Sequence, residues 1–387
     1  MKQIRILTTI GVFLLHSSHN FSSENNGTQQ SLYANLKQQD EVSVFDIFES
    51  IDIILLETGE QSLIADIRKI IHFNDRYYIF DKQQQRIFCF DSVGNFLFKI
   101  SQKGYGLEEY TYIDDFNVDP FNNQLLLLEP FGNLLTFDLN GQFISKIRLP
   151  SEVVAYNEVY IMDENRLMFT SLFNFGFVFY DRAKNAIIDR HYGVEEKKLR
   201  FGFSPFVPLN RAYNYNEDLF LLLPLSNDVI NLSDNSVFSW NFGKLNNMEE
   251  TIENLKNFIL LSNKSEEDFY MFDWVGEKKL NYIVHRSFET SRYKICVLEF
   301  AEFTSRYVFY DKKTEQTFVF ETTREGINLA PHYFFGESII LHNLGVESFD
   351  NFPVYYNLNI LTETQKQLLQ SRKDNDNPFL IKYNFKQ

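Results

Sequence analysis

The sequence is poor in cysteine, in positive charge and in long apolar runs. Two cysteines occur in 387 residues, Cys89 and Cys296, and each stands in an apolar, strand-like run that predicts a buried free thiol. Two cysteines without closely spaced histidines do not make a closed zinc site. Lys and Arg number 37 against 52 Asp and Glu, a net charge of −15, so we expect no nucleic-acid partner. After the first residues no stretch approaches the roughly 18 apolar residues of a membrane-spanning helix, so no transmembrane segment is predicted.

The N-terminus has the pattern of an export signal. Lys2 and Arg5 precede the short apolar stretch 6–15, and a polar run follows. We therefore assign 1–20 to a signal peptide and 21–41 to a flexible linker, and expect the protein in the periplasm or at the cell surface. The run Leu14-Leu15-His16-Ser17-Ser18 resembles a bacterial lipobox, but Ser18 stands where the lipidated cysteine would be. Without that thiol we do not expect a lipid anchor.

Several catalytic motifs are also missing. The chain has no GxSxG elbow and no HExxH, which excludes two enzyme classes only. Gly104 and Gly106 lack the third glycine of a dinucleotide-binding loop, and we interpret them as a turn. We expect Tyr110, just beyond this turn, to pack as an anchor between two repeats. No catalytic residue, resident metal or cofactor is assigned.

Aromatic residues are abundant and point to β structure. The chain holds 41 Phe and 21 Tyr, residues that fit pleated surfaces well. Short apolar strands alternate with turns, and an aromatic-Asp pair closes a strand in several of them: Phe90-Asp91, Phe137-Asp138, Tyr180-Asp181 and Tyr310-Asp311. A repeat of about 40–50 residues built from short strands is typical of propeller blades. The prediction is an all-β fold, with residues 42–387 as a single six-bladed β-propeller domain.

Three further elements complete the predicted architecture. We expect strands at 51–56 and 379–383, from the two ends of the chain, to meet in one composite blade. Apolar residues at helical spacing predict a helical insertion near 246–267. A short C-terminal helix over 362–372 precedes the closing strand, and Trp240 is assigned to the core.

One stretch carries a family resemblance. The residues Gly104-Tyr105-Gly106-Leu107, followed by Ile113-Asp114-Asp115-Phe116, resemble NHL-type repeats. With residues 56–58 and 377–383, they resemble the bacterial six-bladed β-propeller proteins of unknown function with NHL-like repeats. That resemblance implies a propeller fold and export, often with a lipid anchor. It brings no catalytic residues with it.

Two sets of residues are candidates for a site. The first is an aromatic loop broken by Gly and Pro, with an arginine at each end, that would hold a glycan, peptide or protein: Arg200, Phe201, Phe203, Phe206 and Arg211. The second is an acidic cluster with oxygen ligands suited to calcium: Glu108, Glu109, Asp114, Asp115 and Asp119.

Two functions from different classes follow. The first is an exported, non-enzymatic binding or scaffold protein, expected to be a monomer, that recognises a ligand or protein partner on one propeller face. The alternative is a propeller hydrolase or lyase with a metal, calcium being the candidate, at the central channel. The residues favour the non-enzymatic protein without deciding between the two.

Overall fold

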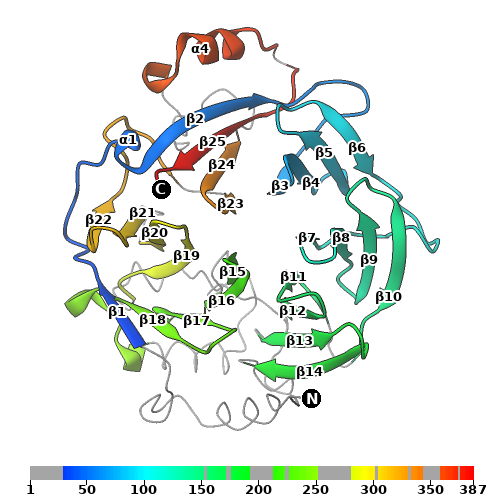
Figure 1. Ribbon diagram of the computed structural model, residues 1–387, viewed down its shortest axis with the longest axis horizontal. Coiled ribbons are helices and arrows are strands. Elements are labelled where there is room, and N and C mark those ends of the chain that lie inside the picture. Colours follow the sequence, from blue (N-terminus) through cyan, green and yellow to red (C-terminus); the bar gives the residue numbers. More distant parts are fainter. Residues whose placement is uncertain are drawn as a thin grey trace, which may run out of the picture.

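The computed structural model describes residues 29–387, apart from 152–154, 171–175, 192–211, 223–225, 252–279, 301–303, 330–332, 343–357 and 374. Six sheets stand around a central opening (Figure 1). The predicted six-bladed β-propeller is confirmed.

The first three blades follow one another along the chain, each with its first strand innermost. Blade I has the strands β3 (Ile67–Phe73), β4 (Arg76–Asp81), β5 (Arg86–Asp91) and β6 (Phe96–Ile100). Blade II has β7 (Asp115–Asp119), β8 (Gln124–Leu128), β9 (Asn133–Asp138) and β10 (Phe143–Arg148). Blade III has β11 (Glu158–Ile161), β12 (Arg166–Thr170), β13 (Phe177–Asp181) and β14 (Ala186–His191).

Two of the other three blades, IV and VI, also include a strand from the N-terminal region. Blade IV has β15 (Ala212–Tyr215), β16 (Asp218–Leu222), β17 (Asp228–Asn231), β18 (Val237–Asn241) and, outermost, β1 (Gln29–Tyr33). Blade V has β19 (Ile283–Glu289), β20 (Tyr293–Glu299), β21 (Ser305–Asp311) and β22 (Gln316–Phe320). Blade VI has β23 (Tyr333–Phe335), β24 (Ser338–His342), β25 (Phe379–Phe385) and, outermost, β2 (Phe48–Leu55).

The middle strands of each blade are buried on both faces. In β4 every residue after Arg76 is buried, and in β9 only the two end residues are partly exposed. The outer strand β10 has no buried residue at all. A middle strand contacts the neighbouring blade on each side, so its sequence is a continuous apolar run without alternation. Cys89 and Cys296 lie in such strands as buried free thiols, as predicted, and Trp240 is 2% exposed in the core.

The aromatic-Asp landmarks mark the end of the third strand of a blade. Asp91 accepts hydrogen bonds from the backbone N–H groups of Val93 and Asn95, and Asp138 does the same for the N–H groups of Asn140 and Gln142. The carboxylate thus adds acceptors to a tight turn that is also closed by backbone hydrogen bonds, such as those from Gly94 to Asp91 and from Gly141 to Asp138. The repeat visible in the sequence is therefore a repeat of this turn.

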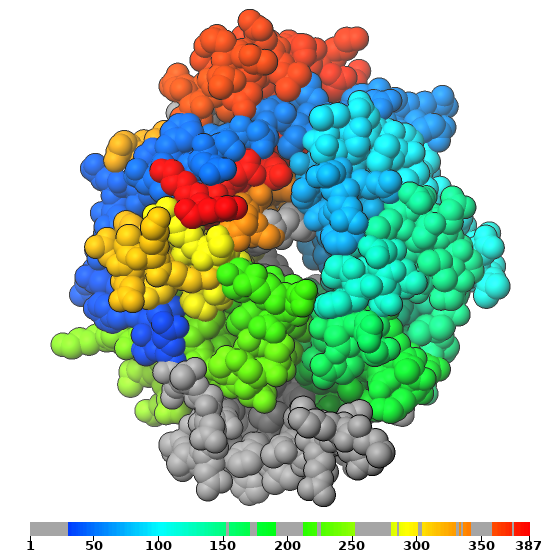
Figure 2. All heavy atoms as spheres, viewed as in Figure 1, coloured from blue at the N-terminus to red at the C-terminus, as the bar shows by residue number. Residues whose placement is uncertain are grey.

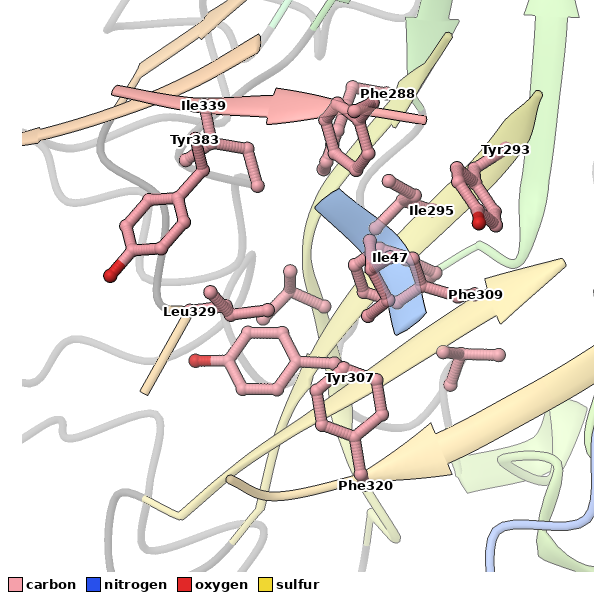
Figure 3. Packing of buried hydrophobic residues seen from close by; sticks show 14 of the residues in the cluster. Ile47, Phe288, Tyr293, Ile295, Tyr307, Phe309, Phe320, Leu329, Ile339 and Tyr383 are labelled. Atoms are coloured by element: carbon pink, nitrogen blue, oxygen red, sulfur yellow. The ribbon is translucent and has the colours of Figure 1, made fainter. Parts of the chain in front are cut away.

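The two ends of the chain meet in blade VI, as predicted. Strand β2 pairs antiparallel with β25 over its whole length, from Phe48 opposite Phe385 to Leu55 opposite Phe379. The core below this closure draws on distant segments, as Figure 3 shows: Ile47 before β2 and Tyr383 of β25 lie with Phe288 and Phe309 of blade V. Closure at β2 and β25 therefore leaves no unpaired seam in the ring.

The segment 29–41, expected to be linker, is structured and forms an N-terminal arm along blades IV and V. Strand β1 pairs parallel with β18 of blade IV. Asp40 then exchanges backbone and side-chain hydrogen bonds with Val319 of β22, and α1 (Val44–Ile47) leads into β2. Strand β1 is hard to recognise from sequence because, among its residues with described burial, only Leu32 is buried.

The predicted helices have different outcomes. The C-terminal helix is confirmed as α4 (Glu363–Gln370), which starts at a capping box formed by Thr362 and Gln365. It lies outside β2 (Figure 1), and Gln365 Nε2 donates to the carbonyl of Ile51 at 2.5 Å. Short 3-10 turns occupy Gly243–Leu245 and Leu358–Ile360. Most of the predicted insertion, 252–267, lies outside the described residues.

Candidate functional site

The two faces of the ring carry very different connections. Neighbouring strands of a blade run in opposite directions, so the connections that precede the first strand and follow the second strand meet on one side, here called the loop face. The strand ends that flank the long intervals 101–114, 192–211, 242–282 and 343–378 all lie on this side. On the opposite side, the hairpin face, first and second strands are joined by short turns such as 74–75, 216–217 and 336–337. The loop face is where the chain has room for a site.

At the loop face the channel mouth contains a charged bridge across three blades. Lys69 Nζ of β3 lies 2.8 Å from Asp115 Oδ1 and donates to the carbonyl of Phe116 at 2.7 Å. Asp115 Oδ2 accepts the N–H of Val159 in β11 at 3.0 Å. The inner strands have no neighbouring strand on the channel side. The bridge therefore supplies hydrogen-bond partners to their backbone groups, the Phe116 carbonyl and the Val159 N–H.

A second carboxylate beside this bridge has an unpaired oxygen. Asp114 Oδ2 is buried and has no hydrogen-bond partner among the described residues. Burial first, and then the charge of Asp115, raise the pKa of Asp114 to about 6, while Lys82 and Arg68 act in the opposite direction. A buried acceptor without a donor is costly unless a ligand or water completes it. The mouth therefore has one group ready to accept a hydrogen bond.

The inner strands carry further polar contacts between blades. Asn117 Nδ2 of β7 donates to the carbonyl of Val159, and Asn214 Nδ2 of β15 donates to the carbonyl of Ile161. Strand β3 has a bulge between Ile67 and Lys69, which places Arg68 at the exposed bulged position. Bulges often re-aim a side chain near functional sites. The mouth thus combines both signs of charge, while Asn117 and Asn214 join the inner strands farther from the loop face.

The connection 101–114 presents two apolar side chains to solvent. Tyr105 is 94% exposed and Leu107 is 72% exposed. Glu109 Oε2 accepts the N–H of Gly106 at 2.7 Å, and a Cβ at Gly104 would lie 2.1 Å from the same oxygen. A side chain at Gly104 would therefore displace the Glu109 carboxylate from its hydrogen bond to Gly106. This network braces the loop in its protruding shape.

Tyr110 fixes the base of this braced loop, as predicted for a blade anchor. Its side chain is fully buried, and its hydroxyl donates to the carbonyl of Gln85 in blade I at 2.6 Å. Glu129, between β8 and β9, accepts hydrogen bonds from the Thr111 backbone N–H and hydroxyl, both at 2.7 Å. Two residues further, Phe131 is 72% exposed. Two connections that are tied together thus expose large apolar side chains on the loop face of blade II.

The predicted ligand-binding residues Arg200, Phe201, Phe203, Phe206 and Arg211 lie outside the described residues. The strands on either side of them, β14 and β15, have their adjoining ends at the loop face.

The acidic cluster does not form one site. Glu109 braces its loop, and Asp115 joins the bridge at the mouth. Asp119 lies at the far end of β7, on the hairpin face, where it pairs with Arg182 at 2.5 Å. Among the described residues, no group of three or more His, Cys, Asp or Glu side chains is placed to hold a metal ion.

Lys69 was missed at the level of sequence. Its only signal is a pair of cations, Arg68 and Lys69, inside an otherwise apolar strand. Its partner Asp115 is in the next blade, and no residue of β3 indicates that the two side chains meet.

Fold and mouth together define the class: a closed six-bladed β-propeller with a polar channel mouth on its loop face. Figure 2 shows the opening at the centre of the ring. Residues 28–384 match the family described as Domain of unknown function (DUF4934), and the chain belongs to that family. The narrower resemblance to NHL-type repeats stays a prediction.

Among solved structures, the chain is similar to a "Putative exported protein" from Bacteroides fragilis NCTC 9343, with 17% identity and a TM-score of 0.69 over 93% of this chain and 100% of that one. It is also similar to BamB from Moraxella catarrhalis, with 9% identity and a TM-score of 0.38 over 75% of this chain and 69% of that one. The first similarity shows the propeller fold, and the second is too low to support an inference. None of the curated proteins matches the chain. Within the described residues, no helix has the length and apolar character needed to cross a membrane.

Proposed function

We propose that this protein is an exported, non-enzymatic binding protein that holds a protein or peptide partner on its loop face. The observation that carries the proposal is the braced connection 101–114, which holds Tyr105 and Leu107 in solvent at 94% and 72% exposure. Large apolar side chains on a rigid support lose little entropy when a partner covers them. The leader-like residues 1–20 and the similarity to a protein named as exported support the location outside the cytoplasm.

The channel mouth would supply specificity to this surface. Asp114 offers a buried acceptor next to the bridge residue Asp115, with the charge of Arg68 nearby. A donor group on the partner that reaches the mouth would satisfy Asp114 Oδ2. No observation on the described residues favours the alternative of a metal-dependent hydrolase or lyase.

A cross-linking experiment tests this proposal with a matched control on the same blade. Phe131, on the loop face, and Phe121, in the β7–β8 turn on the hairpin face, are 72% and 39% exposed. Each is replaced in turn by the photo-reactive p-benzoylphenylalanine in the cells that produce the protein. We expect a discrete cross-linked species from position 131 and none from position 121.

The same cultures test the location. Fractionation should recover the chain outside the cytoplasm, and its retention in the cytoplasm would contradict export. Cross-linking that is equal from both positions, or absent from position 131, would contradict a partner on the loop face.

A further inference from the structure

A second surface lies at the outer rim, away from the channel. A groove of about 640 Å³ separates β1 of blade IV from β22 of blade V. The two strands lie beside each other at the left of the ring in Figure 1. Both are the outermost strands of their sheets. The lining of the groove includes Ser31 and Tyr33 on one side and Gln316 and Thr317 on the other.

The backbone of β22 is open toward this groove at Thr317. Val319 uses its N–H and its carbonyl for the arm residue Asp40, so both groups point away from β21. Peptide groups alternate in direction along an antiparallel strand, and β22 has no bulge. The N–H and carbonyl of Thr317, two residues earlier, therefore point outward as well. Among the described residues, the arm bonds to this position through the Thr317 hydroxyl, which donates to Tyr33, and leaves the Thr317 N–H and carbonyl without a partner.

The backbone of β1 is open toward the same groove. The N–H of Ala34 donates to the carbonyl of Asn241, which places Ala34 and Leu32 on the side that pairs with β18. By the same alternation, the peptide groups of Ser31 and Tyr33 face away from β18. Thr317 Oγ1 donates to the carbonyl of Tyr33 at 3.3 Å, so the two edges meet at one end of the groove.

The charges of the described residues that line the groove are all negative. They are Asp40 and Glu315, and no Lys or Arg is among the described lining residues. Glu315 is exposed at the tip of the β21–β22 turn. A positively charged side chain in the groove would meet two carboxylates and no cation.

We propose that this groove binds an extended, basic peptide segment of a partner protein as an added strand along β22. The segment's backbone would bond to the N–H and carbonyl of Thr317, and alternate lysine or arginine side chains would reach Glu315 and Asp40. Open strand edges recruit extended peptides in this way, with main-chain bonds giving affinity and side chains giving selectivity. The site is independent of the partner proposed for the loop face.

A second copy of the chain fits this groove poorly. Self-pairing through β22 would bring the Glu315 carboxylates of both copies to one interface, together with Asp40. Like charges placed opposite one another across strands are destabilising. A basic segment would instead be attracted by the carboxylates of Glu315 and Asp40.

The test uses a fluorescein-labelled peptide of alternating threonine and lysine and measures its binding by fluorescence anisotropy. Two matched probes accompany it: alternating threonine and glutamate, and the lysine peptide with methylated backbone nitrogens. We expect saturable binding of the lysine peptide only, weakened by salt.

Variants locate the site. Thr317→Pro removes an outward N–H from an edge strand without touching the β21 ladder. This variant should weaken binding of the lysine peptide about tenfold, while the melting temperature of the protein stays unchanged. Glu315→Gln should weaken binding of the lysine peptide about two- to fivefold. If Thr317→Pro lowers the melting temperature, the lysine peptide with methylated backbone nitrogens tests the main-chain bonds in its place.

Three results would overturn the proposal. They are the absence of saturable binding at millimolar peptide, equal affinity for the lysine and glutamate peptides, and binding that Thr317→Pro and Glu315→Gln both leave intact. Sedimentation that shows a concentration-dependent dimer, lost in Thr317→Pro, would instead make a second copy the occupant.

Discussion

At the scale of single residues, the tightest constraint in the ring falls on a glycine. Gly94 has a φ of +94°, and a Cβ there would lie 2.0 Å from the carbonyl oxygen of Leu55, at the end of the strand that closes the ring. Gly326 has a φ of +74°, but a Cβ there would meet nothing within 4 Å. We expect Gly326→Ala to lower the free energy of unfolding by about 1 kcal/mol from backbone strain, and Gly94→Ala by about 3 kcal/mol or more. Denaturant unfolding of both variants measures the difference, and equal losses would mean that the contact with Leu55 is not rigid.

Asp114 gives a pH-dependent prediction. Its pKa in the fold is about 6, above the value of about 3.9 for an unfolded chain. The folded state therefore binds a proton more tightly, and ionisation of Asp114 destabilises the fold as pH rises from about 4 through 6. Asp114→Asn should be more stable than the wild type at pH 7.5, by on the order of 1–2 kcal/mol, and the difference should shrink at pH 4. Melting curves at the two pH values check this, and a constant difference would contradict it.

At the scale of elements, the third-strand aspartate joins strand, turn and neighbouring residues. Asp311 accepts two hydrogen bonds from Arg292, at 3.0 and 2.8 Å, and one from the Lys313 N–H at 2.8 Å. Burial alone would raise the pKa of Asp311, but these hydrogen bonds outweigh it and lower the pKa below its usual value. Asp311→Ala should cost about 3 kcal/mol, and Asp311→Asn, which keeps the turn acceptor, about half of that.

The sign of the pH effect for Asp311 is opposite to that for Asp114. A lowered pKa gives stability that is full above about pH 4 and is lost as pH falls through the folded pKa. The Ala variant and the wild type should therefore converge in stability on acidification. Unfolding curves between pH 3 and 7 test this, and a gap that widens toward low pH would contradict it.

These elements also show how far the sequence leads. The blade repeat was predictable because Asp91, Asp138 and Asp311 perform a local task, accepting N–H groups within the next few residues. Strand β1 was not, since its pairing with β18 joins distant parts of the chain and buries only Leu32 within β1. The bridge of Lys69 and Asp115 was hidden for the same reason. Local chemistry repeats visibly, whereas contacts between blades leave no pattern in one strand.

At the scale of the whole molecule, the N-terminal region binds the ring in two places. Strand β1 covers the outer edge of β18 in blade IV, and β2 forms the outer strand of blade VI. Only the second is part of the closure. The pairing of β1 therefore covers a strand edge, whereas the pairing of β2 closes the ring.

Two truncations separate these roles. A chain that begins at residue 34 loses β1 but keeps Asp40 on β22 and β2 on β25. We expect it to fold as a ring, with a lower melting temperature and the edge of β18 exposed. A chain that begins at residue 56 loses β2, uncovers the strand β25 and removes Ile51 and Ile53 from the core. Since blades are stabilised mainly by their neighbours, opening one blade weakens the whole ring, and we expect loss of cooperative unfolding or aggregation.

A point variant keeps this test decisive if the shorter chain cannot be purified. Ile53→Ala, in the middle of β2, should lower the free energy of unfolding by about 2–4 kcal/mol. Leu32→Ala, in the middle of β1, provides the comparison, as Leu32 packs in the same core cluster. If closure governs the stability of the ring, Ile53→Ala should destabilise the protein more than Leu32→Ala does, with one unfolding transition in both. Equal losses would mean that the arm and the closing strand stabilise the propeller alike, and that the ring does not depend on its composite blade.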